Sequence, residues 1–288
     1  MKHTVPVTAM LVFLFLVAQG IGLLVLQSYV DIEASEETGR TVYEDAPFDI
    51  ERPPLEESSS YLFMLGAILV GTLLILLIIR FKKIRLWKVW FFMSVALCLT
   101  MAFGAFMTDL IALTLGIFLA LWKVLKPNTY IHNLTELFIY AGLAAVFVPL
   151  MNLKSAFMLL VIISLYDMYA VWKSKHMISM AKFQSAAKVF AGLYLQYDKK
   201  GLITKAVPAK KGRKMRNAIL GGGDIGFPLI FAGVVMKTAG WWAFLVSIGA
   251  ALALTWLFWQ GKKDKFYPAM PFITAGCLLG LAAVWLIL

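Results

Sequence analysis

Long apolar runs constrain the fold of this chain more than any other feature of its sequence. A helix of about 20 apolar residues crosses the hydrocarbon core of a bilayer, and nine runs of about that length follow one another along the 288 residues. They lie at residues 5–29, 61–79, 87–107, 110–125, 134–151, 155–172, 218–236, 240–259 and 267–288. The sequence therefore predicts an all-α, polytopic membrane protein with nine transmembrane helices.

The composition excludes the other broad classes of protein. Hydrophobic residues make up 61% of the chain and charged residues only 15%, a balance too apolar for a soluble domain or a disordered chain. The net charge of +11 is better explained by basic loops on one side of a membrane than by a phosphate-binding face. We therefore expect the lipid bilayer as a partner and no nucleic acid.

Basic residues are distributed unevenly between the two sides that nine alternating spans define. Of the 27 Lys and Arg residues, 23 fall on the side of the N-terminus. The other side receives Arg40, Arg52, Lys154 and Lys237. Because Lys and Arg concentrate in cytoplasmic loops, we expect a multi-pass protein of the cell membrane with a cytoplasmic N-terminus and an extracellular C-terminus.

A basic segment divides the chain into two membrane halves. The sequence predicts a six-helix half over residues 1–172, a basic cytoplasmic loop over 173–217 and a three-helix half over 218–288. Apolar residues recur with helical spacing from Met177 to Tyr194, which predicts an amphipathic helix on the inner membrane surface. The stretch from Asp198 to Arg216 has no apolar face, so we expect it to be mobile.

Two of the acidic residues lie where neither water nor a nearby basic residue can solvate their charge. Ten of the 16 acids lie in the loop at residues 31–60, which we interpret as a solvated connector on the outer side. Four others lie in loops or at span boundaries where their charge can be solvated: Asp109, Glu136, Asp198 and Asp264. Only Asp167 and Asp224 lie well inside spans, without a basic residue at their level.

These two acids are expected at the same depth. Asp167 precedes Trp172, at the inner end of its span, by five residues, and Asp224 follows Asn217, at the inner end of the next span, by seven. At about 1.5 Å per residue, both lie roughly 7–11 Å below the inner interface. Neither can remain charged alone at that depth, so the pattern predicts two carboxyls that share a proton, as in the dyad of an aspartic protease.

Glycines and prolines predict irregular backbone beside the two acids. Three glycines at residues 221–223 remove side chains just before Asp224 and allow another backbone to come close. Pro228 lacks the N–H that would bond the carbonyl of Asp224, and Pro268 and Pro271 disrupt the start of the last span. Irregular backbone at membrane depth is tolerated where it lines a water-filled cavity, so we expect such a cavity here.

Three motifs, in this order, resemble those of a known family. The segments Tyr166-Asp167, Gly221-Gly222-Gly223-Asp224 and Pro268-Ala269-Met270 are similar to the YD, GxGD and PAL motifs of presenilin and signal peptide peptidase, with Met270 where the family usually has Leu. The resemblance covers the whole chain and is of the archaeal presenilin type. It implies an intramembrane aspartic endopeptidase of the GxGD type with Asp167 and Asp224 as its catalytic pair.

The resemblance also implies roles for the other motif residues and for partners. Substrate positioning would fall to Tyr166, Gly221, Gly222, Gly223, Pro268, Ala269 and Met270. Substrates would be transmembrane helices of other proteins, with a preference for cytoplasmic C-termini, and neither a metal nor an organic cofactor is needed. The sequence does not define the oligomeric state, and a homo-oligomer is compatible with it.

Alternative functions make different demands on the sequence. A proton-coupled secondary transporter would use Asp167 and Asp224 as relay groups, but it predicts an internal repeat, and GGGDIGFP has no second copy in the first half. A prepilin-type peptidase also uses a GxGD aspartate, and it fits the proline-rich last span less well. A zinc site or a Ser–His pair is disfavoured because the three histidines lie in loops or at boundaries: His3, His132 and His176.

Overall fold

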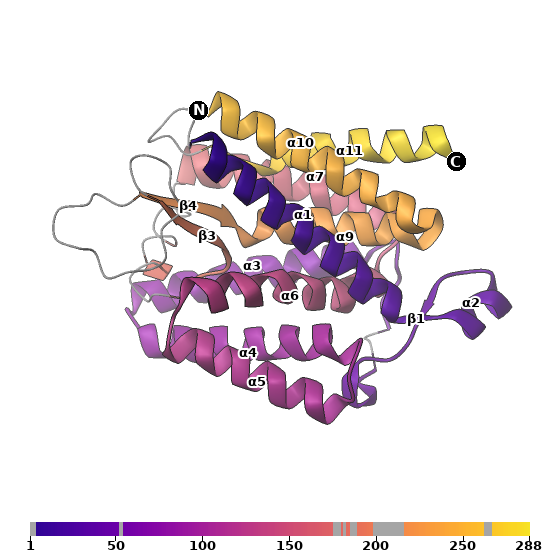
Figure 1. Ribbon diagram of the computed structural model, residues 1–288, viewed down its shortest axis with the longest axis horizontal. Helices are drawn as coiled ribbons and strands as arrows, with labels where there is room; N and C mark the ends of the chain where they lie inside the picture. Colours follow the sequence, from indigo (N-terminus) through magenta and orange to yellow (C-terminus); the bar gives the residue numbers. More distant parts are fainter. Residues whose placement is uncertain are drawn as a thin grey trace.

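Helices dominate the computed structural model, which describes residues 4–51, 54–174, 180, 183–184, 189–197, 216–261 and 267–288. Within these residues, nine helices of 17 to 24 residues run side by side (Figure 1). They are α1 (Val5–Ser28), α3 (Ser60–Arg80), α4 (Ile84–Gly104), α5 (Asp109–Leu125), α6 (Thr129–Phe147), α7 (Leu153–Tyr169), α9 (Gly222–Ala239), α10 (Phe244–Gln260) and α11 (Met270–Ile287). Each predicted span overlaps one of these helices.

The length and apolar character of these helices fit a multi-pass membrane protein. Seven helical stretches in the described part of the chain are long and apolar enough to cross a membrane. One of them, Gly222–Gln260, contains both α9 and α10, which the 3-10 turn η4 (Gly240–Ala243) separates. Helix α5, with 17 residues, is shorter than these stretches. The predicted all-α, polytopic membrane fold is confirmed.

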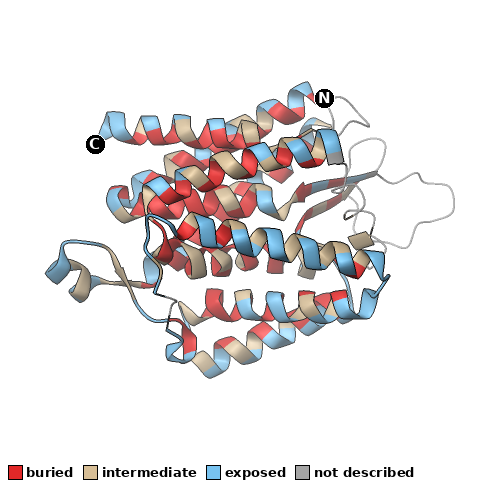
Figure 2. Cartoon of the chain, turned by 180° about the vertical axis from the view of Figure 1, so that it is seen from behind, coloured by how far each residue is buried: buried red, intermediate tan, exposed pale blue. Residues whose placement is uncertain are grey.

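Helix α9 lies at the centre of the bundle. From Ile225 to Met236 every residue except Phe227 is buried, and α9 packs against α1, α6, α7, α10 and α11. Further out, α10 packs along α11, and α4 packs along α5 and α6. Figure 2 shows buried positions on the inward faces of the helices and exposed positions on the outward faces. Asp224, in the first turn of α9, is therefore attached to a firmly packed helix.

Helix α3 is packed least tightly. Its only buried residues are Ser60, Met64 and Ile78, and many of its apolar side chains, such as Leu69 and Leu73, are exposed. In a bilayer such a face is in contact with lipid tails, which are as apolar as leucine. The exposed surface of α3 is therefore consistent with a transmembrane helix at the edge of the bundle.

Short elements form the connector between α1 and α3. Strand β1 (Val30–Asp31) pairs with β2 (Val42–Tyr43), and α2 (Ile32–Thr38) and the 3-10 turn η1 (Pro47–Asp49) complete it. This connector lies at the end of the bundle opposite β3 and β4 (Figure 1).

The side chain of Lys237, near the end of α9, joins the connector to the bundle. Its Nζ donates to the carbonyl of Met151 at 2.7 Å and forms an ion pair with Glu57 at 3.6 Å. The 3-10 turn η2 (Val148–Leu150), which Lys237 also contacts through Pro149 at 3.2 Å, leads into α7. The connector is thus fixed to α9 at the end of that helix far from its first turn.

A two-stranded antiparallel sheet replaces part of the predicted helical structure. Strand β3 (Gly192–Tyr197) pairs with β4 (Arg216–Gly221). The predicted amphipathic helix is therefore wrong from Gly192 to Tyr194, and the predicted span from residue 218 begins as a helix only at Gly222. Along β4, buried and exposed residues alternate from Asn217 to Leu220. That period of two belongs to a strand.

Much of the basic loop lies outside the described residues. Met180, Phe183 and Gln184 are helical, in agreement with the first part of the predicted amphipathic helix. The segment predicted to be mobile, from Asp198 to Arg216, lies outside the described residues except for Arg216, the first residue of β4. The division of the chain into a six-helix half, a loop and a three-helix half stays a prediction.

Glycines bring α10 and α11 into backbone contact. A Cβ atom on Gly276 would overlap the carbonyl oxygen of Gly249, and a Cβ on Gly249 would overlap that of Gly276. A Cβ on Gly280 would lie 2.5 Å from the carbonyl oxygen of Leu245. Gly276 and Gly280 therefore serve the close packing of α11 against α10.

Candidate active site

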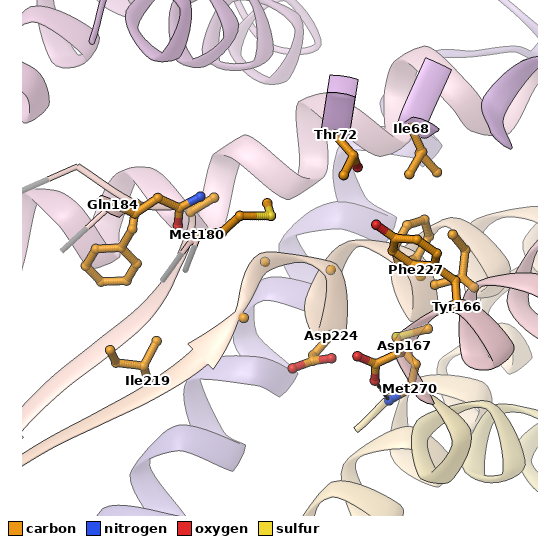
Figure 3. A pocket seen from close by; sticks show the side chains of 16 residues that line it. Ile68, Thr72, Tyr166, Asp167, Met180, Gln184, Ile219, Asp224, Phe227 and Met270 are labelled. Atoms are coloured by element: carbon orange, nitrogen blue, oxygen red, sulfur yellow. Dashed lines mark hydrogen bonds between the residues drawn. The ribbon is translucent and has the colours of Figure 1, made fainter. Parts of the chain in front are cut away.

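One cavity gathers most of the site residues that the sequence predicts. It has a volume of about 340 Å³ and lies between α3, α7, β4 and the first turns of α9 and α11 (Figure 3). The predicted residues in its wall are Tyr166, Asp167, Gly221, Gly222, Gly223, Asp224 and Met270. Pro268 and Ala269 are not part of this wall, but they directly precede Met270 in the chain.

The two acids come from helix ends that meet at this cavity. Asp167 lies in the last turn of α7, before the π-helical turn η3 (Ala170–Ser174), and Asp224 lies in the first turn of α9. Figure 3 shows their carboxyl groups turned toward each other. Asp167 is 7% exposed, and Asp224 is half-buried. Asp224 is only two residues from the start of its helix, whereas the sequence predicts that it follows the inner end of its span by seven. The difference arises because the residues before Gly222 belong to β4.

The start of α11 holds the carboxyl of Asp167. The backbone N–H of Met270 donates to Oδ2 of Asp167 at 3.1 Å, and the N–H of Ala269 lies close to the same carboxyl. One turn earlier on α7, the hydroxyl of Ser164 lies 2.8 Å from that of Thr274 on α11. Two N–H groups at a helix N-terminus are free to make such contacts because they have no partner within the helix. The third motif therefore orients the acid of the first.

Close packing around the glycine motif fixes the turn that carries Asp224. Gly221 is the N-cap residue of α9. A Cβ on Gly222 would lie 2.9 Å from the hydroxyl oxygen of Tyr140, so a side chain at this position would push the ring of Tyr140 away. The turn therefore needs glycine at Gly222 for the close approach of Tyr140.

A buried glutamine on α1 adds a polar contact to the same helix. The amide nitrogen of Gln19 donates to the carbonyl of Ile225, the residue after Asp224, at 2.9 Å. Its amide oxygen accepts from the hydroxyl of Ser247 on α10 at 3.1 Å. Gln19 is fully buried. The only signal for this role in the sequence is that a polar side chain lies inside the first apolar run. The contact ties α1 and α10 to the segment that carries Asp224.

Other residues of the cavity wall carry no chemical signal in the sequence. Ile68 and Thr72 come from α3, and Met180 and Gln184 come from the basic loop. Phe227 lies between this cavity and a second one of about 490 Å³, whose wall it shares. Only the fold brings these side chains to the two acids, so sequence reasoning missed them. Among the residues that the structure describes, no three His, Cys, Asp or Glu side chains form a group that could hold a metal ion.

Comparison with protein families extends the match to nearly the whole chain. Residues 21–287 match the family described as signal-peptide peptidase, presenilin aspartyl protease. The chain belongs to this family. The matched range includes Asp167, Asp224 and all three motifs, so the resemblance inferred from those motifs is confirmed.

Solved structures of presenilin-family proteins share the fold. A presenilin family intramembrane aspartate protease in a C222 crystal form matches with a TM-score of 0.63 and 17% identity, over 98% of this chain and 99% of that chain. The P2 crystal form of such a protease matches with the same score and identity, over 96% of this chain and 97% of that chain. A comparison with curated proteins gives no match. The presenilin-family architecture therefore extends over this chain from end to end.

Proposed function

We propose that this family member is an intramembrane aspartic endopeptidase of the GxGD type, with Asp167 and Asp224 as its catalytic pair. The observation that carries the proposal is that these two carboxyls turn toward each other in one cavity of an apolar helical bundle. Two carboxyls in a site of low polarity do not both ionise readily, so the pair retains one proton. An aspartic protease uses this protonation state.

The ionised carboxyl and the protonated carboxyl have different roles in the reaction. The ionised carboxyl accepts a proton from a water molecule held between them, and the water oxygen attacks the carbonyl carbon of the scissile peptide bond. The protonated carboxyl donates to the carbonyl oxygen as the tetrahedral intermediate forms. When the C–N bond breaks, the carboxyl that took the proton of the water gives it to the nitrogen of the leaving amine. The other carboxylate takes back a hydroxyl proton from the tetrahedral intermediate as the carbonyl of the product re-forms, so the pair again holds one proton.

The cavity supplies orientation for this reaction. The N–H groups of Ala269 and Met270 hold Asp167, and the glycine turn at Gly221–Gly223 carries Asp224. We assign substrate positioning to Tyr166, to these glycines and to Pro268, Ala269 and Met270. The substrates are transmembrane helices of other proteins, which must unwind locally because a hydrogen-bonded helix cannot present its peptide carbonyl to the two acids.

The test of this function uses the purified chain in liposomes with a single-span membrane protein as substrate. Mass spectrometry of the products is expected to locate cleavage within the membrane-embedded segment. The cleavage rate should pass through a maximum with pH, because the reaction needs one ionised and one protonated carboxyl. The apparent pKa values on the two sides of this maximum belong to the pair and not to either acid. The measurement is kcat/KM across the pH range in which the protein stays folded.

The same liposomes distinguish the alternative function. A proton-coupled transporter would carry a solute driven by a pH gradient and leave the substrate protein intact. Solute flux without cleavage would contradict the protease proposal. A cleavage rate that changes monotonically with pH would contradict catalysis by a pair of carboxyls that share one proton. Cleavage that needs no added metal or cofactor is the expected result.

The proposed topology places the N-terminus in the cytoplasm and the C-terminus outside. It is supported by the start of α1 lying at the same end as β3 and β4 and by the end of α11 lying at the other end (Figure 1). In a background without Cys98 and Cys277, Glu36→Cys should react with a membrane-impermeant maleimide on intact cells. Lys83→Cys should react only after permeabilisation. Both positions are exposed, and the reverse labelling pattern would show the opposite topology.

A further inference from the structure

A buried ion pair joins α5 and α6 near the end of the bundle that carries the catalytic pair. The Nζ of Lys123 lies 2.7 Å from Oε1 of Glu136, with side chains 2% and 0% exposed. Lys123 also donates to the hydroxyl of Thr135 at 2.8 Å. The expectation that Glu136 is solvated at the membrane boundary is therefore wrong, because a base on the neighbouring helix neutralises it inside the protein.

The second carboxyl oxygen of Glu136 makes different contacts. Its Oε2 accepts a hydrogen bond from the backbone N–H of Gly192 at 2.8 Å. The same oxygen accepts from the hydroxyl of Tyr140, one turn further along α6. One carboxylate thus connects a lysine on α5, a tyrosine on α6 and the first residue of β3. An ion pair alone would use only the first of these contacts.

Both contacts of this oxygen lead directly to the turn that carries Asp224. Gly192 lies opposite Gly221 in the sheet, and the carbonyl of Ala191 accepts from the N–H of Gly222 at 3.3 Å. The hydroxyl of Tyr140 also approaches Gly222, at 2.9 Å from the position that a Cβ would take. Asp224 follows Gly222 by two residues.

Other side chains of α6 hold the same strand. The amide of Asn133 donates to the carbonyl of Tyr194 at 2.7 Å and accepts from its N–H at 2.9 Å. The Nε2 of His132 lies 2.8 Å from the carbonyl of Gly192. These contacts bind backbone groups of the first residues of β3 to α6. The position of β3 is therefore set by α6, with Glu136 at the residue nearest to the catalytic turn.

We propose that Glu136 is a positioning residue for the reaction proposed above. By holding Gly192 and Tyr140, it fixes the backbone at Gly221 and Gly222 and thereby the carboxyl of Asp224 relative to Asp167. Lys123 neutralises the charge that this acceptor needs. Replacement of a buried ion pair by apolar residues is often neutral for stability or stabilising, so the role of the pair in stability can be separated from its role in geometry.

Two neutral double variants make this separation. Lys123→Met with Glu136→Gln removes both charges and keeps an amide oxygen that can accept from the N–H of Gly192. Lys123→Met with Glu136→Leu also removes both charges but leaves no acceptor. Because a displacement of about 1 Å costs about 100-fold in rate, we expect the leucine variant to lose about that factor in kcat with KM within about twofold. The glutamine variant should stay within about tenfold of wild type.

A second measurement does not depend on catalysis. Amide hydrogen exchange at Gly192 and Gly222 should be faster in the leucine variant than in the glutamine variant, while the two variants unfold at similar temperatures. Tyr140→Phe, which keeps the ring, should show a smaller loss in kcat in the same direction. Wild type and Asp224→Asn serve as the active and inactive references for each preparation.

The outcomes distinguish this inference from the proposed function on which it rests. If wild type does not cleave, the protease proposal fails, and the exchange experiment still decides the role of Glu136. Equal exchange and equal kcat in the two double variants would overturn that role. Equal losses accompanied by equally lowered unfolding temperatures would also overturn it, because they would assign Glu136 to stability alone.

Discussion

Asp167→Asn and Asp224→Asn are each expected to lower the cleavage rate by at least about 1,000-fold, because residues that act as a unit lose most of their effect when one is removed. Asparagine is nearly isosteric with aspartate and adds no charge to the membrane. It cannot accept the proton of the attacking water, nor act as an acid toward the scissile carbonyl oxygen. The measurement is kcat for a transmembrane substrate with purified variants in liposomes, beside their unfolding temperatures.

Asp109→Asn is the matched control for these variants. Asp109 lies at the start of α5, and its Oδ2 accepts from the N–H of Phe48 at 2.6 Å, in the connector far from the cavity. The same chemical change there should leave cleavage close to wild type. The double variant Asp167→Asn with Asp224→Asn should be no slower than either single variant. A single variant that keeps a tenth of the wild-type rate would remove that aspartate from the catalytic pair.

Gly276→Val is expected to destabilise the folded protein by about 3 kcal/mol, the upper end of the range of about 1–3 kcal/mol that is typical of overpacking. The new side chain would meet the carbonyl oxygen of Gly249, a backbone atom that cannot turn away. To relieve the overlap, α11 must move away from α10. Since the first residues of α11 hold the carboxyl of Asp167, cleavage should fall together with stability. Thermal unfolding in detergent and kcat are the measurements.

Gly66→Val provides the comparison for this prediction. Gly66 is exposed on α3, and no atom lies within 4 Å of the position of its Cβ. The same substitution there replaces glycine by a better helix former and should leave the unfolding temperature near wild type. Equal unfolding temperatures for the two variants would show that the contact between Gly249 and Gly276 does not limit the packing of α10 against α11.

The helices and the two acids could be predicted because each has a strong local signal. A run of apolar residues predicts a span without reference to the rest of the chain. Asp167 and Asp224 were found by elimination, since a charge without a base at its level is expensive in a bilayer. The fold placed both in one cavity because α7 ends and α9 begins at the same end of the bundle.

The contacts that orient these acids could not be predicted. Lys123 and Glu136 lie on different helices, and each is close to the end of its apolar run, where either charge can be solvated alone. Residues 216–221 continue into the apolar run of α9, so their pairing with β3 has no separate hydrophobic signal. The N–H groups of Ala269 and Met270 belong to the backbone, and a side-chain pattern does not reveal where a backbone donor points. Such contacts follow from tertiary structure.

The sparse packing of α3 makes the surrounding bilayer a structural component of the cavity. Ile68 and Thr72 close one side of it, although only three residues of their helix are buried by the rest of the chain. In a bilayer, lipid tails rather than side chains of the protein would cover most of the outer surface of this wall. The thickness and stiffness of the host membrane are therefore expected to influence the position of this wall. Rates measured in micelles and in bilayers report on that solvent as well as on the amino-acid sequence.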